Sequence, residues 1–418
     1  MTLDLGALTT ELDARLAEAD ADLSHGFPGE GAGRQPVHTV YVPADRYDAQ
    51  LVPRWGDEAL GAVSVLGGKD VDLADAFGLP VDLVAQVHDR MRTKLAAEPV
   101  EDLRVDFEDG YGTRDDAEED AAVDSAAAAL LESVDHGSGT PFSGIRFKSF
   151  EAPTRARGIR TLARFVEAVT RDGRLPAGFV VTLPKVTSVE QVEAMGVACD
   201  RLEEGLGLSP GAVRFEIQVE TPQAICGPDG TALVARMVHA SQGRCTALHY
   251  GTYDYSASCG IAAAYQSMEH PAADHAKAVM QVAAAGTGVR LSDGSTNILP
   301  VGSREQVQDA WRLHARLVRR SLERGYYQGW DLHPAQLPSR YLATYAFYRE
   351  GLPSAAERLK NYVTQVDSGV MDEPATARAL SDFVVRGLEC GATDEAEVEA
   401  LTGLDRSAVD RLARRPVH

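Results

Sequence analysis

The sequence of 418 residues carries 62 acidic and 41 basic side chains, which gives a formal net charge of −21 at pH 7. So acidic a chain repels nucleic acids and anionic membranes, which argues against both as partners. Hydrophobic residues make up 44% of the chain, as in a globular protein with a sizeable core, and the length allows a full α/β barrel with an appendage or two to three ordinary domains.

The five cysteines are widely spaced and form no C-x-x-C pair, so neither a disulfide framework nor a zinc site is expected. The N-terminal segment has acidic residues where a signal peptide has basic ones followed by an apolar core. No apolar run approaches the roughly 18 residues of a membrane span. These features predict a cytoplasmic protein with reduced thiols.

The first 24 residues carry Leu5, Leu8, Leu12 and Leu16 at helical spacing. This stripe predicts a helix that covers the bottom of a barrel, with a subunit-contact helix as the alternative. Glycines and a proline at 26–35 predict a linker.

From residue 37, short apolar runs alternate with helical patterns. Runs typical of strands lie at 37–42, 103–107, 145–147, 179–183, 213–219, 247–250, 288–291 and 328–332, and helical patterns lie at 115–134, 154–171, 188–206, 260–285 and 303–324. Eight such units predict a (β/α)8 TIM barrel. A doubly wound open sheet is the alternative, but it would carry a Gly-rich phosphate loop after its first strand, where this chain has PADRYD.

The sequence divides into three predicted parts. Residues 1–36 form the N-terminal helix and linker, residues 37–351 the barrel, and residues 352–418 a small all-helical module. The region 52–100 is predicted to be an insertion between the first two barrel strands.

Ionisable residues stand at the C-terminal ends of most candidate strands, where the working residues of such barrels lie. In chain order they are Asp106, Glu108 and Asp109 after the second strand, Arg146 and Lys148 on one face of the third, Lys185 after the fourth, Glu220 after the fifth, Asp254 after the sixth and His333 after the eighth. His333 beside Pro334 is expected to hold its loop by hydrogen bonding.

The ends of parallel strands converge, so Glu220 and Asp254 are expected to lie together. Mg²⁺ prefers a few carboxylate oxygens and keeps positions open for substrate and water, so the pair predicts a Mg²⁺ site, with Mn²⁺ as the alternative metal. Asp106, Glu108 and Asp109 are expected behind these metal ligands.

The cations at the strand ends predict an anionic substrate. A 2-oxo acid would chelate the metal, which would act as a Lewis acid and stabilise an enolate. Arg146 is expected to clamp the enolate oxygen or a carboxylate with two parallel hydrogen bonds, with Lys148 beside it. Lys185 could form a Schiff base, but next to a metal pair an electrostatic role is preferred.

Read in order, these motifs resemble those of the HpcH/HpaI aldolase and citrate lyase beta-subunit family, of the pyruvate/phosphoenolpyruvate barrel superfamily. The resemblance covers roughly residues 37–380. The family's FVPG is YVPA here, DLED is DFED, RVN is RFK, GxxDL is GTYDY and IHPxQ is LHPAQ, while LPK and ETP are intact.

This resemblance implies that Glu220 and Asp254 bind Mg²⁺ and that Arg146 contacts the 2-oxo acid. It also implies that backbone N–H groups near Gly251, Thr252 and Tyr253 hold the substrate carboxylate. The relatives are often trimers or hexamers, so a homo-oligomer is expected.

The helical tail carries a further match, because GVMDEP is similar to the GxMIDxP segment of related lyases but one residue shorter. In those relatives the aspartate acts as an acid/base in the neighbouring subunit's site. The resemblance implies this role for Asp372, with Asp367 as the fallback. The alternative is that Asp372 is the N-cap of the following helix, and both readings stay open.

Three hypotheses about function follow. The first is a Mg²⁺-dependent carbon–carbon lyase or aldolase acting on a free 2-oxo acid. The second is an acyl-CoA lyase or a malate-synthase-like condensing enzyme; coenzyme A use is left open, because ADRYDAQLVPRW replaces the Lys/Arg-bearing segment that meets coenzyme A in the family. The third is a non-catalytic metabolite-binding or complex subunit on the same barrel.

Overall fold

A computed structural model describes residues 4–31, 33–66, 69–364 and 373–413. Its centre is a barrel of eight parallel strands: β1 His38–Pro43, β2 Asp102–Asp106, β3 Phe142–Arg146, β4 Val181–Leu183, β5 Phe215–Val219, β6 Cys245–Tyr250, β7 Arg290–Ser292 and β8 Gly329–Asp331. The strands follow one another in the order β7-β6-β5-β4-β3-β2-β1-β8, and a parallel bridge between Ser292 and Gln328 joins the two ends. The predicted (β/α)8 barrel is confirmed.

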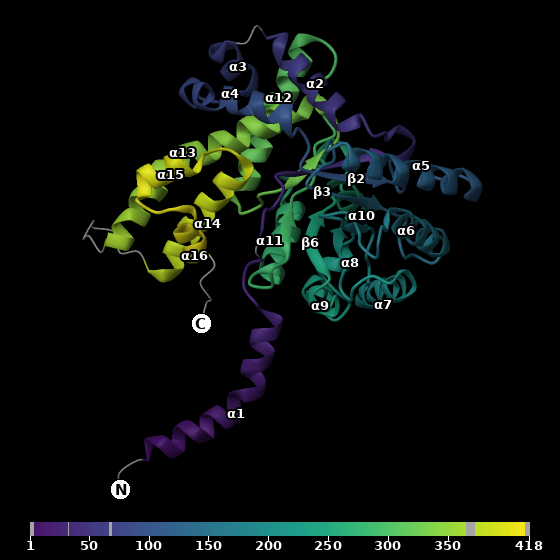
Figure 1. Ribbon diagram of the computed structural model, residues 1–418, viewed down its shortest axis with the longest axis vertical. Coiled ribbons are helices and arrows are strands. Elements are labelled where there is room, and N and C mark those ends of the chain that lie inside the picture. Colours follow the sequence, from purple (N-terminus) through teal and green to yellow (C-terminus); the bar gives the residue numbers. More distant parts are fainter. Residues whose placement is uncertain (1–3, 32, 67–68, 365–372, 414–418) are drawn as a thin grey trace.

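Helices cover the outside of the barrel (Figure 1). They are α5 Asp116–Asp135, α6 Arg155–Val169, α7 Val189–Leu206, α8 Pro222–Ile225, α9 Leu233–Ala240, α10 Thr252–Ser258, α11 Pro271–Ala284 and α12 Arg304–Glu323. Outward-facing strand residues such as Val105, Ile145 and Ile217 are fully buried in the core against this layer. Burial of this apolar face, at about 25 cal/mol per Å², holds helices and sheet together.

The barrel interior, in contrast, is filled with polar side chains. Arg104 on β2 donates to Glu216 on β5 through Nε at 3.1 Å and Nη2 at 2.8 Å. Glu216 also receives the hydroxyl of Thr182 and lies 3.1 Å from Nε2 of His249. Burial alone would raise the pKa of Glu216, but Arg104 and His249 outweigh burial and hold this pKa below its usual range.

The region between β1 and β2 is the predicted insertion, and it is helical. It contains α2 Leu51–Ser64, α3 Asp70–Phe77 and α4 Val81–Ala97. These helices pack on α12 and α13 at one end of the molecule (Figure 1).

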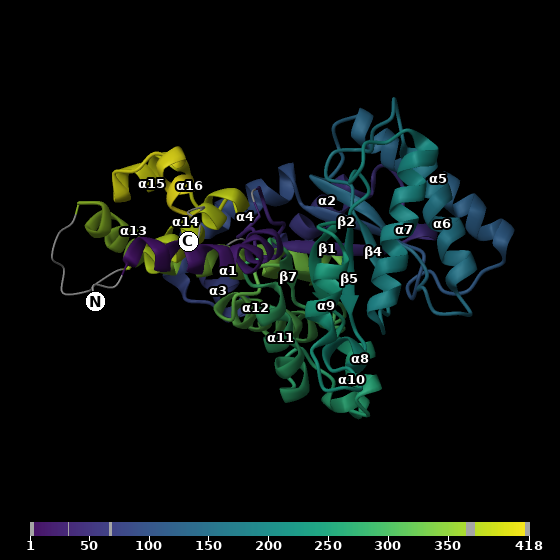
Figure 2. The ribbon, with the colours of Figure 1, turned by 90° about the horizontal axis from the view of Figure 1, so that it is seen from below.

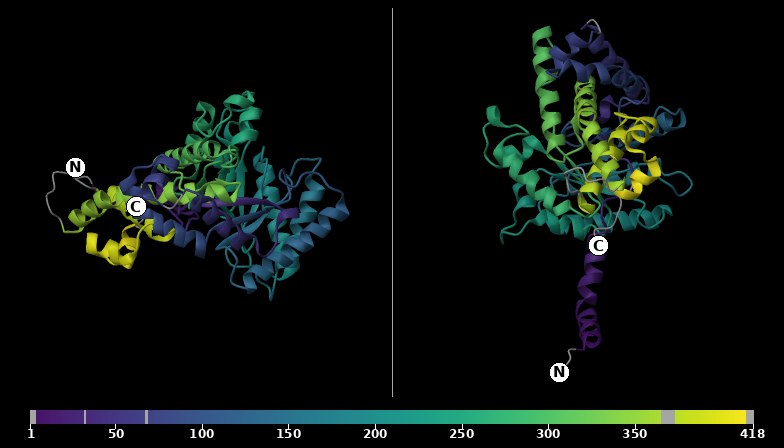
Figure 3. Two further views of the ribbon diagram at one scale, coloured as in Figure 1. Left: turned by 90° about the horizontal axis from the view of Figure 1, so that it is seen from above. Right: turned by 90° about the vertical axis from the view of Figure 1, so that its left-hand side faces the viewer.

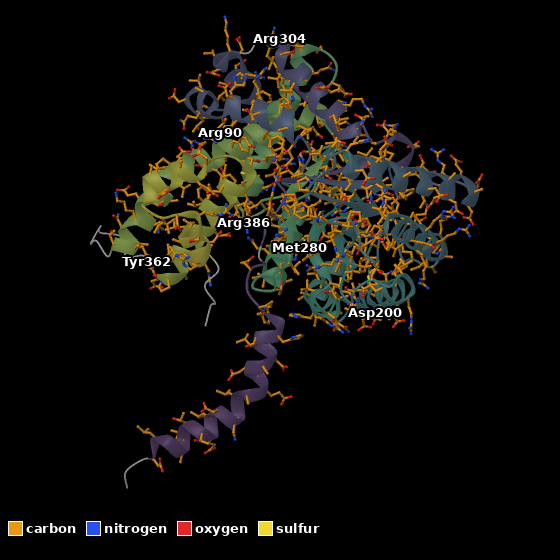
Figure 4. The ribbon with its side chains drawn as sticks, viewed as in Figure 1. Arg90, Asp200, Met280, Arg304, Tyr362 and Arg386 are labelled. Carbon is orange, nitrogen blue, oxygen red and sulfur yellow. The ribbon has the colours of Figure 1, made fainter. Side chains whose placement is uncertain are left out.

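The C-terminal module is built on a long helix, α13 Leu337–Thr364, which leaves the barrel after β8. It is followed by α14 Pro374–Cys390, α15 Glu395–Thr402 and α16 Arg406–Ala413, which share a small core of their own. Arg386 of α14, which is labelled in Figure 4, ties the module to the barrel. Its guanidinium lies 4.3 Å from the ring centre of Tyr327. The predicted boundary at 351/352 falls inside α13.

The N-terminal helix α1 Leu5–Gly26 forms as predicted but does not cover the barrel. None of its residues is buried, and it projects away from the rest of the molecule (Figures 1 and 3). The expectation that it packs against the bottom of the barrel is wrong, because only the segment after its end touches the barrel. Figure 2 shows the helical module and the barrel side by side along the molecule.

None of the helices in the described part of the chain combines the length and apolarity that a membrane span needs.

Candidate active site

Glu220 is the buried centre of the site at the C-terminal end of the barrel. It follows β5, and its side chain is about 1% exposed. Nε2 of Gln218 donates to Oε2 of Glu220 at 2.6 Å, and the backbone N–H of Lys185 donates to Oε1 at 2.7 Å. Lys185 has a φ of 51°, a left-handed conformation that is strained for a residue with a side chain.

The ammonium group of Lys185 lies among three carboxylates from two other segments. Its Nζ is 2.8 Å from Oδ2 of Asp109, 3.1 Å from Oε1 of Glu108 and 3.4 Å from Oδ2 of Asp254. Asp254 lies in the first turn of α10 and is half exposed. The structure therefore brings the strand-end acids and Lys185 into one cluster.

Arg146 lies deeper, at the end of β3, and its partner is Asp106. Nε and Nη2 of Arg146 each donate to one carboxylate oxygen of Asp106 at 2.7 Å, and Tyr41 lies under the guanidinium at 4.8 Å. Nη1 has only long contacts, 3.5 Å to Gln218 and 3.6 Å to Glu108. One edge of the expected two-bond clamp is thus already used inside the protein, and Nη1 is the nitrogen left for a ligand.

Two buried acids in this cluster bind protons unusually tightly. Burial, with the negative charge of Asp254, raises the pKa of Glu220 to about 8 despite the nearby Lys185. Burial likewise raises the pKa of Glu108 to about 7. A carboxylate whose burial outweighs the positive charges around it gains strongly from a further cation.

Lys148 is not part of the cluster. β3 ends at Arg146, and Lys148 turns outward, where its Nζ donates to Oε2 of Glu119 at 2.7 Å and to the carbonyls of Phe107 and Gly112. The expectation that it shares a face with Arg146 is wrong for this reason. Asp372 and its fallback Asp367 lie outside the described residues.

Gly251 lies against Glu220, and its lack of a side chain allows this contact. A Cβ at Gly251 would lie 2.5 Å from Cβ of Glu220. Its N–H donates to the carbonyl of Val219 at 2.9 Å and is therefore not free for a substrate. Thr252 and Tyr253 begin α10, and the hydroxyl of Tyr253 accepts the N–H of Asn297 at 2.7 Å.

Two residues of the site were not predicted, because the prediction considered only ionisable residues at strand ends. They are Gln218, which holds Glu220, and Tyr41, which underlies Arg146. Both lie inside their strands, Gln218 one residue before the end of β5 and Tyr41 two residues before the end of β1. The period of two along β5, in which Glu216, Gln218 and Glu220 alternate with apolar residues, is a signal that could have found Gln218. His333, as predicted, holds its loop, since its Nδ1 accepts the N–H of Ala335 at 3.1 Å.

The donor set suits a hard divalent cation. Glu220 and Asp254 offer carboxylate oxygens, and the burial of Glu220 outweighs the positive charges of Lys185 and Arg146 nearby. The described residues contain no group of three or more His, Cys, Asp or Glu side chains placed to hold a metal. Two carboxylates are enough for Mg²⁺, which keeps several water molecules and completes its shell with substrate.

Comparisons with other proteins find lyases and related barrels. The chain is 31% identical over 156 residues to the L-malyl-CoA/beta-methylmalyl-CoA lyase of Haloarcula marismortui; the match covers 37% of this chain and 41% of that protein. The chain thus spans about two fifths of the length of this relative.

Two solved structures illustrate the likeness in fold. CitE of Mycobacterium tuberculosis, in complex with magnesium, acetoacetate and coenzyme A, is 17% identical with a TM-score of 0.49, over 86% of this chain and 99% of that chain. Haloferax volcanii malate synthase is 14% identical with a TM-score of 0.49, over 92% of this chain and 99% of that chain. Citrate lyase beta-like proteins, which the motifs of the sequence resemble, are thus among the proteins to which this chain is similar.

A family model described as "Domain of unknown function (DUF6986)" matches residues 16–417, nearly the whole length of the sequence. The chain belongs to this family.

Proposed function

We propose that the protein is a Mg²⁺-dependent carbon–carbon lyase or aldolase that makes or breaks a bond next to the keto group of a 2-oxo acid. The observation that carries the proposal is Glu220, a fully buried carboxylate held by two donors beside Asp254, with a pKa raised to about 8. Perturbed acids in a ring of charged strand ends are typical of active sites.

Each residue of the cluster has a role in this proposal. Glu220 and Asp254 would hold Mg²⁺, which when bound supplies Lewis-acid stabilisation of the negative charge that develops on the keto oxygen. Arg146, fixed by Asp106, directs Nη1 toward the substrate and stabilises the same charge. Lys185 fixes Glu220 through its N–H and keeps a positive charge among Glu108, Asp109 and Asp254.

The test combines metal titration with a substrate panel. Isothermal titration should show Mg²⁺ binding to the wild type and its loss in Glu220→Gln and Asp254→Asn. Aldol cleavage and decarboxylation of a panel of 2-oxo acids should require Mg²⁺ and fall by at least about 10³-fold in both variants. The exposed Glu204→Gln serves as the control. Turnover that survives Glu220→Gln would contradict the proposal, and silence across the panel would favour a metabolite-binding subunit without catalysis.

A second candidate is a lyase or condensing enzyme that acts on an acyl-CoA, in which the thioester partner binds beside the same acids. The malyl-CoA lyase among the relatives favours it. Titration with coenzyme A and acetyl-CoA separates the two candidates, because the absence of heat at millimolar ligand argues against a thioester substrate. Turnover that needs the thioester would establish it.

A further inference from the structure

Helix α1 carries an apolar stripe that nothing in the described structure covers. At 3.6 residues per turn the stripe residues fall within about 80° of one another, so they share one face. They are Leu5, Leu8, Leu12, Leu16, Ala19 and Leu23, and the leucines among them are 39 to 66% exposed. A lone helix of 22 residues gains most of its stability from packing, so this face needs a partner.

The charges on α1 argue against pairing with another copy of itself. The helix carries five acidic residues, Glu11, Asp13, Glu18, Asp20 and Asp22, against Arg15 alone. These acids flank the stripe on both sides, so two such helices laid face to face would repel one another. The surface that fits α1 is apolar and flanked by cations.

Such a surface lies at the N-terminal mouth of the barrel, opposite the candidate active site. A cavity of about 710 Å³ opens there, with apolar walls that include Phe142, Leu175 and Phe179. Its rim carries Arg174, Arg214 and Arg290. In the described part of the chain these three arginines have no carboxylate within ion-pair distance, although the protein as a whole is strongly acidic. Burial, with Arg386 and Arg214 nearby, lowers the pKa of Arg290, although Glu389 opposes this shift.

The linker prevents α1 from covering its own mouth. The ring of Phe27 packs against His239 at 5.3 Å, and the N–H of Gly29 donates to the carbonyl of Gly286 at 2.8 Å. Nη2 of Arg290 donates to the carbonyl of Gly33 at 2.7 Å. These contacts fix the exit direction of the chain, so that α1 points away from its own barrel (Figures 1 and 3).

We propose that α1 of one copy docks with its leucine stripe across the N-terminal mouth of a second copy, whose own α1 docks in return. The stripe would face the apolar walls, and the flanking acids would pair with the arginine rim. This exchange of helices is independent of the chemistry at the other end of the barrel.

Light scattering after size exclusion tests the proposal on the full chain. The wild type should be dimeric at micromolar concentrations. The arm variant Leu8→Ser, Leu12→Ser, Leu16→Ser and the mouth variant Arg174→Glu, Arg214→Glu should each weaken dimerisation by at least about 100-fold. The control Ala14→Ser, Ala17→Ser, Ala21→Ser changes the opposite face of α1 and should leave the dimer intact.

A mixture of the two variants decides between modes of association. Arm and mouth variants, each monomeric alone, should form a heterodimer when mixed, because one intact helix then meets one intact mouth. A mouth variant that remains dimeric would mean that α1 helices pair with each other, and a wild type that is monomeric would mean that α1 stays undocked or folds back. Either result would overturn the proposal.

Discussion

At the scale of single residues, the position of Glu220 depends on donors that do not themselves touch a substrate. Gln218 and the N–H of Lys185 occupy one lone pair on each carboxylate oxygen and leave the others for a cation. Such supporting hydrogen bonds orient metal ligands and raise their affinity.

Gln218→Leu removes the donor to Oε2 and should weaken Mg²⁺ binding by about 10- to 100-fold, while the fold is retained. Isothermal titration measures the loss. Gln50→Leu, at an exposed position, provides the control. Equal Mg²⁺ affinity in the two variants would show that Gln218 does not hold the ligand.

The raised pKa of Glu220 predicts how stability depends on pH. Between the usual value of about 4.3 and the folded value of about 8, the folded state binds one proton more than the unfolded state. Without Mg²⁺, the free energy of unfolding should therefore fall as pH rises from about 4 to 8. Urea unfolding at several pH values should show a smaller slope in Glu220→Gln, with Glu108 supplying the remainder.

Mg²⁺ should reverse this loss above pH 7 in the wild type, because it stabilises the ionised carboxylate, and should do so much less in Glu220→Gln. If the free energy of unfolding without Mg²⁺ depended on pH equally in the wild type and in Glu220→Gln, the pKa of Glu220 would not be raised.

At the scale of elements, Gly351 and Pro353 lie in the interior of α13 without ending it. The sequence predicted a boundary there, because the pattern after Gly351 changes to short helices without strands. The structure supplies the reason for the glycine: a Cβ at this position would lie 2.5 Å from Cζ of Phe383 on α14. A tertiary contact therefore overrides local propensity, and sequence alone could not show that contact.

Gly351→Ala should consequently destabilise the protein by about 1–3 kcal/mol through overpacking against Phe383. Gly196→Ala, in the interior of α7 where a Cβ would meet nothing within 4 Å, should instead stabilise it by about 0.5–1 kcal/mol. Urea denaturation of both variants measures the contrast. Two changes of the same sign would mean that propensity rather than packing governs residue 351.

The elements also show how much of the fold can be predicted from the sequence. All eight strands and most of the helices were predicted, because strand runs and helical periods alternate regularly. The direction of α1 was not predicted, because an apolar stripe indicates that a helix needs a partner but not where that partner lies. The prediction that Lys148 shares a face with Arg146 was wrong for a related reason. Residues two apart share a face only within a strand, and β3 ends at Arg146.

At the scale of the whole molecule, the barrel is held by ion pairs along its axis as well as by apolar packing outside. Arg104 is about 1% exposed and contacts both Asp102 and Glu216, so its removal would deprive two buried carboxylates of the guanidinium that they share. Arg104→Met should cost about 3–5 kcal/mol of stability.

The matched control is Arg201→Met, which breaks an exposed pair with Glu204 and should cost less than about 1 kcal/mol. Chemical denaturation at pH 7 compares the two variants. Equal losses would mean that the axial pairs contribute no more than surface ones.

The layer of Arg104, Glu216 and His249 also lies between the two ends of the barrel. It forms the floor of the N-terminal cavity, and Tyr41 and Gln218 lie between it and the acids at the other end. The layer therefore separates the cavity at the N-terminal mouth from the acids at the C-terminal end. A ligand of the acids would reach them from the C-terminal end, and a helix docked at the arginine-lined mouth would leave that approach uncovered.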